Sequence, residues 1–574
     1  MKKFLKRSVA VILCIMLVAA SLVFASAKDK ELKFTVASDT HFQCESDLAP
    51  LSNDPSAEKY ISGMLNSDVY SYAAMQGQMD YESKAIVKKM LSDFASSDSE
   101  YLLIAGDLTC GKRQSHLELA ELLGQAEKDS GKQIYVICGN HDCDKKADEK
   151  YIDIDEFKSI YADFGYSEAL CRHESSGSYT VDLCDDYRLI AIDSCIYGKD
   201  NGEINDSVLG WIKEQAEAAK ADGKKLIGMM HHSILPHFEV QPMIKKYSSL
   251  ASTLADLGIK LMFTGHIHAN DISSAQSKSG NVIYDIQTGS LICAPNAYRT
   301  VTVTDEKIDI KSSYVTSIDT NDLVKGYSEK QLALIKSDFA SYAWGFYEAG
   351  ICKYVNRYIG SAGKLGKTLK LTEGTLPYDE LDKLLRKVGK ALALDIYDDG
   401  STPGVVDSIE EIAGLADYTL PKSDYKRPYQ VAAKIMFSFY HGDEETVLGG
   451  NEVPLLYDCI KAALAYFVTD LTFGNNISEL LIKLSDVDLR NENISVLSKI
   501  NYADNAVSKL ADALLLSLTD GLRADLCSPS DINVTIDGYG TANDIENGFT
   551  INLFKKVFEK IFEIFNIYFE LLFK

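Results

Sequence analysis

Short apolar runs, separated by longer polar or amphipathic stretches, recur through the first half of the chain. Six of these runs are too short for helices and predict strands buried on both faces: 32–38, 101–105, 133–138, 188–193, 225–230 and 260–264. Helical periodicity lies between several of them, as in 115–128 and 204–221. Alternating runs at 282–287 and 300–310 predict antiparallel strands. We therefore expect residues 31–312 to form a layered α/β domain with a mixed sheet system.

From about residue 322 the pattern changes to longer stretches of helical periodicity. Ser328 and Gln331 have the spacing of a capping box, which predicts the start of a long helix over 329–358. Further helices are predicted at 378–394, 429–440, 455–471, 477–484 and 505–522, with loops at 398–403 and 441–452 and a short β-like insert near 532–537. The expected division is an α/β domain over 28–320 and a mostly helical domain over 321–574.

The N-terminal segment has the pattern of a targeting sequence. Four basic residues lie in 1–7, an uncharged apolar run follows over 8–24, and Ala25-Ser26-Ala27 fits a signal peptidase site. The apolar run is shorter than the roughly 20 residues that a spanning helix needs. A signal peptide over 1–27, cleaved near Ala27, is therefore favoured over an uncleaved anchor, and the protein is expected to be secreted or extracytoplasmic.

The C-terminal segment 549–574 predicts an amphipathic helix, because its polar residues recur every three or four positions among Phe and Ile. The positive charges of its Lys residues and the negative charges of its Glu residues nearly cancel, whereas helices that bind membrane surfaces usually carry a basic polar face. Docking onto the helical domain, or onto a second copy of it, is therefore favoured over contact with a membrane surface.

The length of the chain and its net charge exclude some classes of protein. A chain of 574 residues predicts two or three domains, and its net charge of −24 excludes nucleic-acid binding through a broad basic face. Small anionic substrates are compatible with this charge, because a bound metal reverses the local field. The twelve cysteines are scattered. Cys171 and Cys184 flank a predicted strand, and the sequence leaves open whether they pair.

Histidine is rare and clustered, with nine of the ten histidines between His41 and His268. Five predicted strands are followed directly by residues that can bind metals: Asp39-Thr40-His41, Gly106-Asp107, Gly139-Asn140-His141-Asp142, His231-His232 and Gly265-His266-Ile267-His268. In open α/β sheets, ligand sites form beyond the carboxyl ends of the strands, so these segments can meet at one edge. Asp39 and His41 are two apart, and a strictly extended backbone would direct both to one face.

Seven of these residues offer carboxylate, amide or imidazole donors: Asp39, His41, Asp107, Asn140, His231, His266 and His268. Such a set suits divalent Mn, Fe, Zn or Ni. Seven ligands are too many for one ion but natural for two, and a carboxylate can bridge ions roughly 3.5–4 Å apart. We therefore expect two divalent metal ions.

The five motifs, in this order and each after a strand, resemble the calcineurin-like metallophosphoesterases over roughly residues 31–312. The resemblance implies a four-layer α/β/β/α sandwich. It also implies that Asp39, His41 and His268 hold one metal, that Asn140, His231 and His266 hold the other, and that Asp107 bridges them. His141 would lie near the substrate, where Asp142 could orient it.

The activity implied by this resemblance is hydrolysis of a small phosphomonoester or phosphodiester. Two cations would lower the pKa of a water, hydroxide would attack phosphorus in line, and His141 would protonate the leaving oxygen or stabilise the phosphoryl charge. Cys110 stands where purple acid phosphatases have a tyrosine ligand, so no tyrosinate–iron colour is expected. The sequence that follows Gly106 resembles that of the bacterial phosphodiesterase-type members of the family more than that of the purple acid phosphatases. The alternative is a non-catalytic, metal-stabilised binding protein whose helical domain recognises a cell-surface partner.

Other residues near these motifs are given structural roles. His232 and Asp193 are expected to pack around the site without binding metal, with the alternative that His232 exchanges roles with His231. Residues 287–290 are expected to lie near the site. His116 is expected at the surface or at a helix cap, His237 on a loop at the mouth of the site, and His441 in a plain loop. For Arg299 a salt bridge to an acidic residue is favoured over contact with a substrate phosphate.

Overall fold

The computed structural model describes residues 31–48, 77–237, 244–359, 372–415, 419–444, 447, 449–470 and 530–539. The predicted signal peptide (1–27), the predicted helices at 477–484 and 505–522, and the predicted C-terminal helix (549–574) lie outside these residues.

A six-stranded sheet forms one half of the α/β domain. Its strands are β1 (Leu32–Ala37), β2 (Tyr101–Ala105), β3 (Gln133–Ile137), β11 (Ala297–Val303), β12 (Lys307–Tyr314) and β13 (Asn533–Asp537), in the order β13-β12-β11-β1-β2-β3. β1, β2 and β3 are parallel, whereas β11, β12 and β13 pair in antiparallel fashion. The carboxyl ends of the three parallel strands therefore lie at one edge.

A seven-stranded sheet forms the other half. Its strands are β4 (Cys171–Arg172), β5 (Tyr179–Asp182), β6 (Tyr187–Ile192), β7 (Lys225–Met230), β8 (Ile259–Thr264), β9 (Ile272–Gln276) and β10 (Val282–Gln287), in the order β4-β5-β6-β7-β8-β10-β9. The central strands β6, β7, β8 and β10 are parallel. Where strands were predicted in the two sheets, their bounds differ from the observed ones by about one residue, except that the run 300–310 is a hairpin of β11 and β12. The strands β4, β5 and β9 were not predicted. The run 282–287, predicted to be antiparallel, is antiparallel to β9 but parallel to β8.

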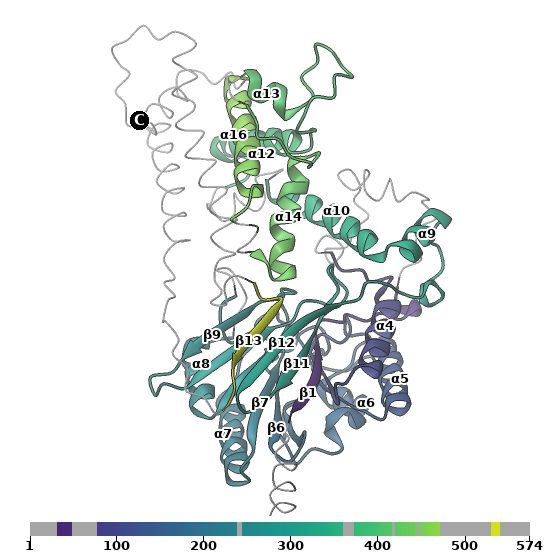
Figure 1. Cartoon of the computed structure of the whole chain (residues 1–574), viewed down its shortest axis with the longest axis vertical. Coiled ribbons are helices and arrows are strands. Elements are labelled where there is room, and N and C mark those ends of the chain that lie inside the picture. The colour runs from purple at the N-terminus through teal and green to yellow at the C-terminus, as the bar shows by residue number, and fades with distance from the viewer. Residues whose placement is uncertain are drawn as a thin grey trace, which may run out of the picture.

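The two sheets face each other and are covered by helices on their outer sides (Figure 1). Phe34 of β1 meets Phe263 of β8 edge to face, with ring centroids 5.3 Å apart. The helices α4 (Ser83–Ser96), α5 (Arg113–Ser130) and α6 (Ile154–Ile160) pack beside the first sheet, and α7 (Asp206–Ala221) and α8 (Tyr247–Asp256) pack on the second. This is the predicted four-layer α/β/β/α sandwich.

Adjacent residues of β8 explain why the strands read as continuous apolar runs. Phe263 points into the core between the sheets, whereas Met262 packs with α7 and α8 on the outer face. Because both faces of the sheet are buried, successive residues are all apolar rather than alternating. Three short turns of helix complete the domain: η1 (Glu45–Asp47), η2 (Ala162–Tyr166) and η3 (Thr320–Asp322).

The helical region follows the sandwich and packs above the carboxyl ends of the strands (Figure 1). It contains α9 (Glu329–Ser337), α10 (Phe339–Ile359), α12 (Leu376–Ala391), α13 (Ile409–Leu415), α14 (Pro428–His441) and α16 (Glu452–Asp470). The Ser328–Gln331 capping box is present. The predicted helix over 329–358 is two helices, because Asp338 leaves the helical conformation and its carboxylate accepts hydrogen bonds from Ser341 at the start of α10.

The boundary between the two regions is less simple than predicted. The expected β-like insert is β13, but it does not stay with the helices: it pairs with β12 in register Ile308↔Ile536 and extends the six-stranded sheet. This pairing covers an edge strand that would otherwise expose unpaired backbone groups. Cys171 and Cys184 are both free thiols. No helix in the described part of the chain is long and apolar enough to cross a membrane.

Candidate metal centre

The five predicted segments meet at one edge of the sandwich. The backbone beyond β1 runs beside that beyond β2: the N–H of Asp39 donates to the carbonyl of Gly106 (3.1 Å), and the N–H of His41 donates to the carbonyl of Asp107 (2.9 Å). The backbone N–H of His266, from the loop after β8, donates to both carboxylate oxygens of Asp39 (3.1 and 2.9 Å). Three loops that are distant in sequence are thus joined by backbone hydrogen bonds.

One donor group consists of Asp39, His41 and His268. The Nε2 atoms of His41 and His268 are 3.2 Å apart. Asp39 Oδ1 lies 3.8 Å from His41 Nε2 and 3.5 Å from His268 Nε2. All three side chains are buried, and their donor atoms face a common point.

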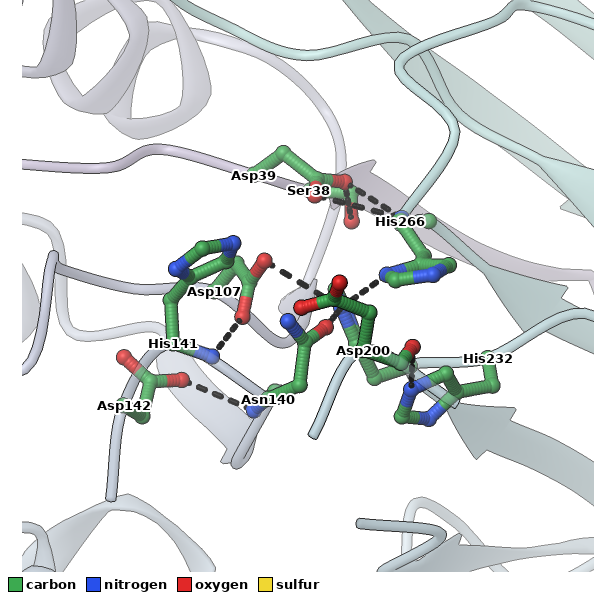
Figure 2. A network of polar contacts seen from close by, with 12 residues as sticks. Ser38, Asp39, Asp107, Asn140, His141, Asp142, Asp200, His232 and His266 are labelled. Carbon is green, nitrogen blue, oxygen red and sulfur yellow. Dashed lines mark hydrogen bonds and ion pairs between the residues drawn. The ribbon is translucent and has the colours of Figure 1, made fainter. Parts of the chain in front are cut away.

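A second donor group consists of Asn140, His231 and His266. His231 Nε2 lies 2.9 Å from Asn140 Oδ1 and 3.2 Å from His266 Nδ1. Figure 2 shows Asn140 and His266 facing this point from opposite sides. His266 therefore offers its Nδ1 atom, whereas the other three histidines of the two groups offer Nε2.

Asp107 stands between the two groups. Its Oδ2 atom lies 3.8 Å from His41 Nε2 and 3.3 Å from His231 Nε2. Its Oδ1 atom accepts a hydrogen bond from the backbone N–H of His141 (2.8 Å), which fixes the rotation of the carboxylate. One oxygen of one carboxylate thus faces both donor groups.

These spacings fit two cations. Two nitrogens that are each about 2.0–2.1 Å from one ion are roughly 2.9–3.4 Å apart at octahedral to tetrahedral angles. The pairs His41–His268 and His231–His266 are both 3.2 Å apart. Imidazole, carboxylate and amide oxygen are together typical ligands of divalent transition metals. The residues present can therefore hold two such ions, with Asp107 shared.

Burial and charge shift the pKa values of the donors. Burial by itself would raise the pKa of Asp107, but the nearby His231, His141 and His41 lower it well below its usual value. Burial would lower the pKa of His231, yet Asp107 raises it to about 9. For His41, burial prevails and lowers the pKa to about 3. Cations that bind here would compete with a proton on His231 and would take its place beside Asp107.

The ligand residues have unusual backbone conformations. Five of them have positive φ angles: Asp39 (49°), His41 (35°), Asp107 (48°), His266 (77°) and His268 (64°). Asp39 and His41 therefore come together through two left-handed residues, and not through the extended backbone that the sequence suggested. Such conformations cost about 1–3 kcal/mol each and persist only where the surroundings hold them.

Two glycines permit the close approach of the loops. Gly106 has φ 87°, and a Cβ atom on it would lie 2.6 Å from His231 Nδ1. A Cβ atom on Gly265 would lie 1.8 Å from Ser38 Oγ. Both distances are far below van der Waals contact, so the Gly-Asp and Gly-His spacings reflect a steric requirement.

His141 and Asp142 have different surroundings. His141 is exposed at the mouth of the site, and its ring lies edge to face with His41 at a centroid distance of 5.3 Å. Asp142 is fully buried. Its Oδ2 accepts from the N–H groups of Gly139 (2.8 Å) and Leu108 (3.1 Å), and its Oδ1 accepts from that of Thr109 (2.9 Å).

The role predicted for Asp142 is therefore corrected. Its carboxylate joins the loops after β2 and β3 through their backbones, so it positions Asp107 and Asn140 and does not orient the ring of His141. Burial and the Asp107 charge raise the pKa of Asp142, while the three backbone donors oppose this shift.

The outer nitrogens of the ligand histidines also have partners. His231 Nδ1 lies 3.0 Å from the carbonyl oxygen of Ala105. His41 Nδ1 lies 3.9 Å from the Cys110 thiol, and His268 Nδ1 lies 3.9 Å from that of Cys293. Such contacts fix the orientation of metal-binding imidazoles. Cys293 was not recognised from the sequence, because it belongs to no motif and comes near the site only in the fold.

The other histidines make different contacts. His232 lies close enough to His231 and His266 for the three to offer ligands to one ion. Both of its ring nitrogens have other partners, however, with Nδ1 at 2.8 Å from Ser194 Oγ and Nε2 at 3.2 Å from the Asp200 carbonyl. Two predictions are wrong. His116 is not at the surface but buried, and His237 is not at the mouth but buried between carboxylates.

The contacts of these two residues explain their burial. His116 Nε2 is 3.0 Å from the Asp142 carbonyl and 2.8 Å from Thr109 Oγ1. His237 forms an ion pair with Asp271 and lies 3.4 Å from Asp285 Oδ2. His441 is not in a loop but ends α14 and stacks on Tyr314.

The surroundings of the site supply further polar groups. Figure 2 shows Asp200 close to His232, on a loop after β6 that the sequence did not single out. A pocket of about 340 Å³ opens beside this loop, lined by Lys145, Cys195, Ile196, Tyr197, Glu203 and Asn205. Cys195 Sγ donates to the carbonyl of Cys138 (3.5 Å), which precedes the Gly139-Asn140 motif. One residue that lines the pocket therefore contacts the backbone just before Asn140.

Comparisons of the sequence with a family model and with known proteins all find phosphoesterases. Residues 32–270 match the family model for calcineurin-like phosphoesterases. Over 220 residues the chain is 26% identical to a Rhodococcus erythropolis protein named "Probable cyclic nucleotide phosphodiesterase", covering 37% of this chain and 66% of that one. Over 171 residues it is 25% identical to a cAMP/cGMP dual specificity phosphodiesterase of Mycobacterium tuberculosis, covering 29% and 48%. The matched region thus spans less than two thirds of either curated relative.

Among solved structures, the chain is similar to a dimetal phosphatase from Danio rerio. The TM-score is 0.35 and the sequence identity 10%, with 49% of this chain and 96% of that chain covered.

Proposed function

Residues 32–270 form a calcineurin-like phosphoesterase domain, and on that premise we propose that the protein is a dinuclear metal-dependent hydrolase of phosphoric esters. The observation that carries the proposal is the position of Asp107, whose Oδ2 atom faces both donor groups at 3.8 and 3.3 Å. A single buried carboxylate placed in this way is suited to bridge two ions.

Each donor group has its own ion in this proposal. Asp39, His41 and His268 hold one, Asn140, His231 and His266 hold the other, and Mn, Fe, Zn or Ni fits the donors. When bound, two such ions supply Lewis acidity and make a water molecule acidic enough to act as a nucleophile near neutral pH.

The chain itself contributes the placement of groups and a proton. Asp142 and the glycines hold the loops so that the donors converge before substrate arrives, which removes the cost of organising them. His141 is exposed beside the donors, and its ring lies against that of His41. We assign it the role of protonating the leaving oxygen or of stabilising the phosphoryl charge.

The substrate class we favour is a phosphodiester with an aromatic or nucleoside-like substituent. Support comes from the names of the two curated relatives and from the pocket beside the loop after β6. In that pocket Tyr197 offers a ring, Asn205 an amide and Lys145 a cation. Phosphomonoesters are the competing class.

A substrate panel tests the function. The chain starting at residue 28, loaded with Mn²⁺, is assayed on bis(p-nitrophenyl) phosphate, p-nitrophenyl phosphate and the 2′,3′- and 3′,5′-cyclic nucleotides. We expect metal-dependent turnover, with diesters preferred over the monoester. Two bound ions without turnover of any ester would favour the alternative, a metal-stabilised binding protein.

We also propose that the mature protein acts outside the cytoplasm, on the strength of the basic, apolar and small-residue order of residues 1–27. N-terminal mass spectrometry of the secreted protein is expected to give Lys28 as the first residue. Secreted protein that begins at Met1 would contradict this proposal.

A further inference from the structure

The loop that carries His266 and His268 contacts both the metal centre and the apolar core of the helical region. Its two histidines are members of the donor groups, whereas the residues that alternate with them, Ile267 and Ala269, pack in the apolar core of the helical region. Ala269 is completely buried there. The helical region therefore contacts the opposite side of the very residues that offer ligands.

Helix α14 ends on this loop. The backbone N–H of Asn270 donates to the carbonyl of Phe439 (3.3 Å), and the Asn270 side-chain amide donates to the carbonyl of His441 (3.3 Å). Carbonyls in the last turn of a helix have no partner within the helix. Here the ligand loop supplies partners for two of them, so the position of the loop depends on the end of α14.

Gly442 sets the distance between α14 and the loop. It terminates α14 in the left-handed conformation with φ 85°, and a Cβ atom on it would lie 2.5 Å from the backbone oxygen of Asn270. The neighbour is backbone, which cannot rotate away as a flexible side chain could. A side chain at 442 must therefore displace either the helix end or the loop.

The other end of the ligand loop is connected to Gly442 as well. Gln287 Nε2 donates to the carbonyl of Gly265 (2.8 Å), and the Gln287 carbonyl accepts from Nε and Nη2 of the buried Arg299 (3.2 and 3.0 Å). Arg299 Nη1 donates to the carbonyl of Asp531 (2.8 Å), whose N–H donates to the carbonyl of Gly442 (2.8 Å). For Arg299, which was predicted to form a salt bridge, the structure shows these contacts to backbone carbonyls.

We propose that the helical region is a positioning module of the metal centre, acting through Gly442 and the end of α14 on the loop 265–270. This inference rests on the proposed dinuclear function. His266 belongs to one donor group and His268 to the other, so displacement of this one loop withdraws a ligand from each ion. Substitutions in the helical region, which supplies none of the donor atoms, then control metal affinity.

The test compares two glycine variants of the full chain, Gly442→Ala and Gly131→Ala. Gly131 also ends a helix in the left-handed conformation (φ 69°), but a Cβ atom there would meet nothing within 4 Å. The two variants thus share the conformational cost and differ in the contacts of the added Cβ atom, of which the shortest by far is to the loop. Mn²⁺ alone is titrated into metal-free protein and free Mn²⁺ is measured by electron paramagnetic resonance.

We expect Gly442→Ala to raise the Mn²⁺ dissociation constants about tenfold or more, as loss of supporting contacts to metal ligands typically does. Gly131→Ala is expected to bind like the unaltered protein. Equal affinity of both variants would overturn the inference, whereas failure of the unaltered protein to bind Mn²⁺ would overturn the proposed function itself.

If Gly442→Ala does not fold, a pair of variants at Ile267 tests the inference instead. Ile267→Ala removes the contact of the ligand loop with the helical core, and Ile267→Val retains most of it. The alanine variant should bind Mn²⁺ at least severalfold more weakly, and the valine variant should stay near the unaltered value. Identical affinity of both would overturn the inference.

Discussion

Replacement of Asp107 by Asn is the sharpest test of the metal centre. The substitution keeps the shape of the side chain and can keep the hydrogen bond from His141, which reaches Oδ1 at 2.8 Å. It removes the charge on Oδ2, the atom that faces both donor groups. At an effective dielectric constant of about 20, two divalent ions about 3.75 Å apart repel each other by roughly 18 kcal/mol. A carboxylate oxygen about 2.1 Å from an ion attracts it by roughly 16 kcal/mol under the same assumption.

The attraction lost is therefore comparable to the repulsion that it offsets, and the second ion should not stay bound. We expect bound Mn²⁺ to fall from two to at most one per chain, and turnover of bis(p-nitrophenyl) phosphate to fall on the order of 10³-fold or more. Metal content is measured by plasma mass spectrometry after gel filtration.

Asp193→Asn serves as the matched control for Asp107→Asn. Asp193 is another buried aspartate after a strand, but its carboxylate binds the N–H groups of Gly177 and Cys195 and the Tyr197 hydroxyl. Its substitution should lower stability and leave two ions bound. Two ions in Asp107→Asn, or turnover within tenfold of the unaltered enzyme, would refute the bridging role.

Three further predictions concern individual residues. His141→Ala should leave metal content unchanged and reduce turnover about 10²–10⁴-fold for alkoxide leaving groups, with a smaller loss for p-nitrophenolate, which needs no proton; an equal loss for both would contradict the assigned proton transfer. Burial opposes a charge on His237, but its two carboxylate neighbours raise its pKa to about 10. Because this pKa lies above the ordinary value of 6.5, the stabilisation is complete below about pH 6.5 and is lost as the pH rises towards 10, by an amount on the order of 4 kcal/mol. Urea unfolding from pH 6 to 10 should show this decline in the unaltered protein and a flatter profile in His237→Gln, and parallel profiles would disprove it. Gly106→Ala should lower the melting temperature and the metal content together, because its Cβ atom would lie 2.6 Å from His231 Nδ1, and normal metal content would show that the approach is not required.

The strands of the sandwich and the chemical types of the candidate ligands could be predicted from local pattern. β2 and β7 begin and end where the apolar runs do, since a strand buried on both faces is apolar at most positions. The residues after β1, β2, β3, β7 and β8 could be grouped for a related reason: parallel strands of a sheet end at one edge, so polar residues at those ends are brought together whatever lies between them.

Several roles depended on contacts between distant residues and could not be predicted. Asp142 follows His141 in sequence, yet its carboxylate is occupied by backbone N–H groups of the loop after β2, 33 and 34 positions away. The burial of His116 depends on the same pair of loops. β13 pairs with a strand more than 200 residues earlier. The pattern of residues within a short stretch of sequence carries no information about such distant partners.

The sequence by itself determined the central strands of the sandwich, their approximate bounds and the side chains available at one edge, because each follows from the pattern of residues within a short segment. Only the tertiary structure decided which oxygen of Asp107 faces both donor groups and which carboxylate joins the loops after β2 and β3. It also decided that the end of α14 contacts the loop that carries His266 and His268. Distances of this kind are set by packing between segments that are far apart in sequence, such as Asn270 and His441, which are 171 positions apart, and packing is a property of the whole fold.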